Sequence, residues 1–132
     1  MLQSRVDVQH FSRLGICLTL VCALSLTLSG CSSQPRNYSG FYVFGAEVEV
    51  FSPCGSQKNY WVLTTDPLWT RLTDTHQALV TEPYEGIFVE VEGYYAGLPD
   101  EDRDGAFAAQ SDGLFRITEV RTMRRIMASD CK

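Results

Sequence analysis

The stretch GFYVFGAEVEVF, from Gly40 to Phe51, decides the fold prediction because its apolar side chains alternate. One face carries the residues Tyr42, Phe44, Ala46, Val48 and Val50. Glu47 and Glu49 fall on the other face. A period of two with one apolar face predicts a single long strand that is buried on one side and wet on the other. Gly45 in its middle permits a bend or bulge.

A second strand and a helix are predicted next. Turn residues Ser52–Ser56 interrupt the alternation, and Tyr60–Thr64 is an aromatic and β-branched run, so the two strands should pair antiparallel. Asp66 and Pro67 suit the first turn of a helix, with Asp66 accepting free backbone amides and Pro67 lacking one.

Leucines at helical spacing continue this helix, which we expect to plug one end of the sheet; they are Leu68, Leu72 and Leu79. His76 has no His or Cys partner at metal-ligand spacing, so a surface or helix-capping histidine is expected.

The remaining sequence predicts two more strands. Ile87–Tyr95 alternates cleanly, Gly97–Gly113 is a loop rich in Asp and Gly, and Leu114–Met123 is the last strand. Its alternation slips between Ile117 and Val120, which predicts a bulge there. A helix over Ile117–Met127 is the competing interpretation. The fold predicted is mainly β: a small antiparallel barrel with one helix, closest to the oligonucleotide/oligosaccharide-binding (OB) architecture.

The amino-terminal part predicts export. Met1–Arg13 is polar and cationic, and the apolar run Leu14–Leu28 is short for a permanent membrane span. The sequence LSGC at Leu28–Cys31 resembles the lipobox of bacterial lipoproteins, in which the cysteine thiol receives a diacylglycerol and the new amino terminus is acylated, as with palmitate. A cysteine that happens to lie within a membrane-spanning helix is the alternative.

Three segments follow from this resemblance: a signal peptide over residues 1–30, a lipidated tether over 31–39 and the barrel domain over 40–132. In lipoprotein families an Asp after the lipidated cysteine commonly marks retention in the inner membrane. Ser32 stands there, which favours an outer-membrane anchor with the domain facing the periplasm.

Charge argues against a nucleic-acid partner. The chain has a formal charge of −5, and loss of Arg5, Arg13 and Asp7 with the signal peptide leaves nine cations and fifteen anions, or −6. An acidic domain repels phosphate backbones. The one basic cluster is expected to be a solvated, salt-bridged face; it comprises Arg116, Arg121, Arg124 and Arg125.

Three segments resemble the C-terminal barrel domain of NlpE-like lipoproteins. Phe51–Val62 resembles its opening hairpin, Ile87–Gly93 its middle strand, and Leu114–Ile117 with Cys131 its closing strand and terminal cysteine. NlpE is an outer-membrane lipoprotein linked to copper tolerance and envelope stress. Its N-terminal barrel carries a Cys-x-x-Cys pair that this sequence lacks, so the resemblance implies the barrel and the location rather than copper chemistry.

Two thiols remain once the signal peptide is removed and Cys31 is lipidated: Cys54 and Cys131. An even pair in an oxidising periplasm predicts a disulfide. A redox-sensing or metal-binding pair is the alternative.

The acidic run Asp100–Gly105 matches the start of a calcium-binding loop, with Asp100, Asp102 and Asp104 at alternate positions. Ser111 stands where that loop needs its bidentate Glu. A solvated acidic loop without an ion is therefore expected, and no cofactor is predicted.

No catalytic motif is present, so we predict a non-enzyme. The first hypothesis is an envelope accessory module that contacts an unidentified envelope protein. The second is a module that binds a small ligand, such as a glycan or peptidoglycan fragment, or a metal. Trp61, Tyr94 and Tyr95 would supply stacking surfaces for a glycan.

Overall fold

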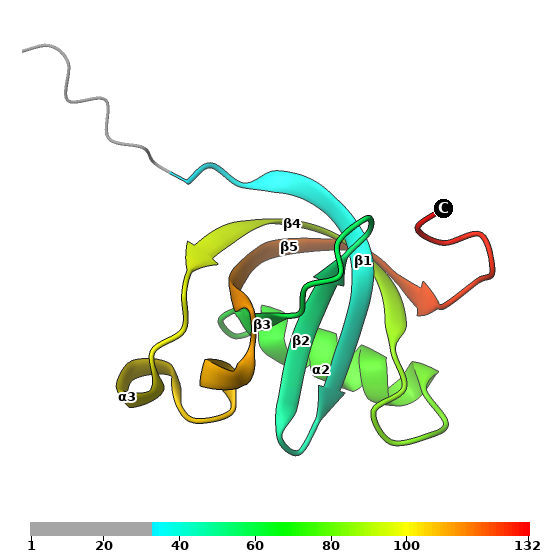
Figure 1. Ribbon diagram of the computed structural model, residues 1–132. Helices are drawn as coiled ribbons and strands as arrows, with labels where there is room; N and C mark the ends of the chain where they lie inside the picture. The colour runs from blue at the N-terminus through cyan, green and yellow to red at the C-terminus, as the bar shows by residue number, and fades with distance from the viewer. Residues whose placement is uncertain (1–32) are drawn as a thin grey trace, which may run out of the picture. The chain divides into compact units, whose positions relative to one another are not determined.

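The computed structural model describes residues 33–132, which form a closed five-stranded barrel (Figure 1). The barrel order is β1-β2-β3-β5-β4. The strands are β1 (Arg36–Gly45), β2 (Val48–Pro53), β3 (Tyr60–Leu63), β4 (Ile87–Gly97) and β5 (Gly113–Arg125). The main helix is α2 (Leu68–Leu79), with a four-residue helix α3 (Glu101–Asp104) and a 3-10 turn at Ala108–Gln110. The signal peptide and Cys31 lie outside the described residues.

The first predicted strand is two strands, so that prediction is wrong. β1 and β2 pair antiparallel from Gly40 opposite Pro53 to Gly45 opposite Val48, and the chain turns at Ala46 and Glu47. The tight turn preserves the apolar alternation on both arms, which explains why the sequence resembles one continuous strand. Gly45 is the last residue of β1, directly before the turn, and does not lie at a mid-strand bend.

β1 also begins earlier than predicted. Arg36 pairs with Gly93 of β4, so the last four residues assigned to the tether belong to the sheet. The polar residues here are exposed, and their sequence has no apolar period to mark them as strand.

β3 pairs antiparallel with β2, as predicted, and parallel with β5, which closes the barrel. The prediction of a wholly antiparallel sheet is therefore corrected at one pairing. A strand pair joined by a long connection through α2 and β4 has no need of the antiparallel hairpin geometry.

The helix is confirmed, but its predicted cap is not. α2 starts at Leu68 without a side-chain cap, and the Asp66 carboxylate instead accepts a hydrogen bond from the Thr70 hydroxyl at 2.9 Å. Leu72, Thr73 and His76 lie on the buried face of α2. Figure 1 shows this helix crossing behind the β1–β2 hairpin, where it covers one end of the barrel.

β4 and β5 form the longest pairing, and the bulge predicted in β5 is present. Gly93 faces Ile117 whereas Glu92 faces Glu119, so Thr118 is the extra residue. The competing helix over residues 117–127 is wrong, because β5 continues to Arg125. The predicted loop 97–113 contains α3 and the 3-10 turn, two short elements with no extended apolar period.

The core fills the barrel interior. Fully buried side chains from all five strands and α2 meet there: Tyr42, Phe51, Val62, Leu72, Ile87, Val89, Val91, Phe115, Ile117 and Val120. Within residues 33–132, no helix is long and apolar enough to cross a membrane.

Candidate functional site

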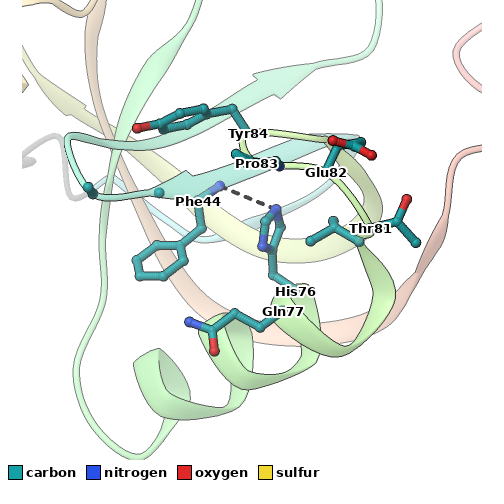
Figure 2. Close-up of a pocket in the computed structure, with 10 residues that line it drawn as sticks. Phe44, His76, Gln77, Thr81, Glu82, Pro83 and Tyr84 are labelled. Atoms are coloured by element: carbon teal, nitrogen blue, oxygen red, sulfur yellow. Dashed lines mark hydrogen bonds between the residues drawn. The ribbon is translucent and has the colours of Figure 1, made fainter.

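A pocket of about 500 Å³ opens where the β1–β2 turn, the second half of α2 and the following segment meet (Figure 2). We call it the apical pocket. Its lining residues are Phe44, Gly45, Ala46, His76, Gln77, Val80, Thr81, Glu82, Pro83 and Tyr84. Apolar walls come from Phe44, Val80 and Pro83, and Glu82 is the one carboxylate among the ten.

His76 lies at the base of this pocket, with 2% of its surface exposed. The prediction of a surface or capping histidine is therefore wrong, because His76 is four residues after buried Leu72 and shares its face of α2. Its Nε2 lies 2.8 Å from the Glu85 carbonyl oxygen and 3.4 Å from the Phe44 amide nitrogen. One nitrogen cannot donate and accept at once, so the shorter contact assigns the proton to Nε2. Nδ1 is then a buried acceptor without a protein partner.

Tyr84 forms the rim of the pocket in an unusual backbone conformation. Its φ is +63°, in the left-handed region that side chains larger than glycine seldom adopt, and 55% of its surface is exposed. The ring lies against Gly45, where an added Cβ would overlap it. Gly45 is therefore required for the close packing of the Tyr84 ring.

A carboxylate lies between α2 and the barrel beside this pocket. The Tyr42 hydroxyl and Trp69 Nε1 each donate to Glu49 over 3.1 Å. Burial raises the pKa of Glu49, and the two hydrogen bonds oppose that rise. Burial raises the pKa of the Tyr42 phenol as well. The three side chains tie β1, β2 and α2 together and fix the wall of the pocket.

The three aromatic residues proposed for glycan stacking do not form one face. Tyr94 and Tyr95 line a hollow beside α3, whereas Trp61 lines a different hollow of about 250 Å³. Trp61 shares the second hollow with Val50 and with Phe107 from the β4–β5 connection. Tyr60 packs against Tyr95, with ring centroids 4.8 Å apart, and its neighbour Trp61 points to the opposite face of β3.

Tyr95 belongs to an aromatic cluster at the other end of the barrel. Its ring centroid lies 4.8 Å from that of Tyr60, 5.3 Å from that of Phe115 and 5.6 Å from that of Tyr38. These contacts account for Tyr95 by packing, although 43% of its surface is exposed.

Cys54 and Cys131 are joined by a disulfide, with their Cα atoms 4.8 Å apart. The carboxyl-terminal tail that follows β5 returns to the turn after β2, where Cys54 lies. Arg124 holds this tail, because its guanidinium donates to both Asp130 oxygens at 2.8 and 2.7 Å and stacks 4.0 Å from the Phe88 ring centroid.

The acidic loop uses its carboxylates locally. Asp100 caps α3 by accepting from the Arg103 amide, and Asp104 accepts from the Asp100 amide and from the Arg103 guanidinium. The hydrogen bond from Arg103 lowers the pKa of Asp104. Among the described residues no three His, Cys, Asp or Glu side chains gather as a metal site.

The apical pocket is not predictable from the sequence, because its lining comes from three segments that show no shared motif. One signal was present: Tyr84 is an aromatic residue between Pro83 and Gly86, in a turn where polar residues are expected.

The closed barrel order, the parallel β3–β5 pairing and the helix over one end define an OB barrel. A family model described as the NlpE C-terminal OB domain matches residues 32–119. The chain therefore belongs to the family of NlpE C-terminal OB domains, which is not an enzyme family. Searches of curated proteins and of solved structures return no match.

Proposed function

We propose that this chain is a lipoprotein held in the outer membrane through Cys31, and that its OB barrel is a non-enzymatic module that contacts another envelope protein. The main support for this proposal is that the chain belongs to the family of NlpE C-terminal OB domains. The LSGC pattern at Leu28–Cys31 supports the anchor, and the Cys54–Cys131 bridge suits an oxidising compartment.

The short length of chain between Cys31 and β1 supports a barrel that stays close to the bilayer. Four residues lie between Cys31 and the start of β1 at Arg36, and the five extended Cα-to-Cα steps across them span at most about 18 Å. Two or more acyl chains hold a protein firmly at a membrane.

Separation of the inner and outer membranes on a density gradient tests this proposal. The wild-type chain should migrate with the outer membrane, Cys31→Ser should leave that fraction, and Ser32→Asp should move to the inner membrane. A wild-type chain found in the soluble fraction, or a Cys31→Ser variant that still migrates with the outer membrane, would refute the anchor.

The hollow at Trp61 favours a second candidate, a ligand-binding module. Trp61 and Phe107, which is 47% exposed, offer two aromatic surfaces to a sugar ring. In a Trp69→Phe background, Trp61 is the single tryptophan of the chain, so its fluorescence reports binding of soluble peptidoglycan fragments. A saturable change would support this candidate, and no change at millimolar ligand would oppose it.

A further inference from the structure

We propose that the apical pocket binds an aliphatic side chain of a partner polypeptide that is flanked by lysine or arginine. This inference rests on the proposed function as an interaction module and names the surface that carries it.

The size and lining of the pocket suit an aliphatic side chain together with the backbone next to it. A volume of about 500 Å³ falls in the range of about 300–1,000 Å³ typical of ligand pockets. Phe44, Val80 and Pro83 supply apolar walls, and Ala46 leaves the entrance open. The Glu49 hydrogen bonds hold Trp69 and Tyr42 behind these walls, so the pocket is already formed.

The strained rim indicates a function for the pocket. A residue other than glycine in the left-handed region is strained, and it keeps that conformation only where the surrounding structure fixes it. Tyr84 is fixed by its contact with Gly45, yet more than half of its surface remains exposed. An aromatic ring that is held in place but left uncovered is suited to pack against a partner.

Charge around the entrance selects the partner. Glu82 lines the pocket and Glu47 follows Ala46 in the β1–β2 turn; both are exposed. Within residues 33–132 neither carboxylate takes part in a salt bridge. A hydrogen bond from the Thr81 amide lowers the pKa of the Glu85 carboxylate, and the charge of nearby Arg125 lowers it further. A cationic partner residue is therefore the complement that Glu47 and Glu82 lack.

The pocket lies at the end of β1 that is farther along the chain from Cys31. β1 begins at Arg36, five positions after Cys31 in the sequence, and ends nine residues later at Gly45 on the pocket wall. At about 3.3 Å per residue this is a path of about 30 Å along the strand. The pocket and the residue at which the tether joins the barrel are therefore at opposite ends of β1.

Titration of the full chain in detergent, labelled with 15N, tests the proposal. The probe is the peptide acetyl-Lys-Leu-Lys-amide, and the controls are acetyl-Lys-Gly-Lys-amide and acetyl-Glu-Leu-Glu-amide. We expect saturable amide shifts at the apical pocket with the probe and a Kd about tenfold lower than for either control. Ala46→Trp should abolish binding by filling the entrance, while a well-dispersed spectrum shows that the variant is folded.

A matched pair of variants separates charge recognition from general electrostatics. Glu82→Gln should raise the Kd about two- to fivefold, as loss of an exposed ion pair does, whereas Glu101→Gln on α3 should leave it unchanged. Equal Kd values for the three peptides, shifts confined to the hollow at Trp61, or self-association of the chain through this pocket would overturn the proposal. Because the titration does not depend on lipidation, its failure is distinguishable from failure of the membrane anchor.

Discussion

Removal of the Cys54–Cys131 bridge should lower the stability of the domain more than loss of any exposed ion pair. The two cysteines are 77 residues apart, so the bridge closes a loop that contains most of the barrel. The chain-entropy relation gives about 4.5 kcal/mol for a loop of this length at 25 °C. Measured losses in small secreted domains are about 2–5 kcal/mol, and we expect a value in that range.

The assay is urea unfolding of the oxidised wild-type domain and of a Cys54→Ser/Cys131→Ser double variant. A loss of 3 kcal/mol corresponds to a fall in Tm of more than about 10 °C in a domain of this size. Wild-type protein in reductant is the matched control and should unfold at the same urea concentration as the double variant.

Two results would contradict the reasoning. A loss below about 1 kcal/mol would show that the bridge does not restrict the unfolded chain. Two thiols of the untreated periplasmic protein that react freely with an alkylating agent would show that the bridge is not formed there.

Three further predictions concern the core, the tail and the acidic loop. Phe115→Ala should cost about 3–5 kcal/mol of unfolding free energy, because Phe115 is fully buried, whereas exposed Phe107→Ala should change it by less than about 0.5 kcal/mol. The hydrogen bond from Arg124 lowers the pKa of Asp130 to about 2, so its contribution is present above pH 4 and is lost as the pH falls toward 2. The stability difference between wild type and Asp130→Asn should therefore shrink over that interval in urea titrations, and a constant difference would refute the linkage. Added calcium should leave Tm unchanged, and a saturable rise that Asp102→Ala abolishes would contradict this.

The sequence predicted those elements whose burial repeats at a regular period. Ile87–Tyr95 has a clean alternation and is part of β4, and the slip between Ile117 and Val120 marks the bulge of β5. The prediction of one strand over Gly40–Phe51 is wrong because apolar residues at every second position fit one strand as well as two strands joined by a turn at Ala46 and Glu47.

The site was less predictable because it depends on contacts between distant segments. Nothing near His76 in the sequence shows that the Glu85 carbonyl will lie against its ring. The position of the Tyr84 ring depends on its packing against Gly45, which is 39 residues away in the chain. Periodicity identifies a buried face, but it does not show which loops close over the end of a barrel.

The central claim is that Cys31 is the lipid-bearing first residue of an envelope-anchored OB barrel. Mass spectrometry of the amino-terminal peptide, from protein purified out of the membrane fraction, tests it most directly. We predict a peptide that begins at Cys31 and carries the added mass of a diacylglycerol and an amide-linked acyl chain. An amino terminus elsewhere, or an unmodified Cys31, would contradict the claim.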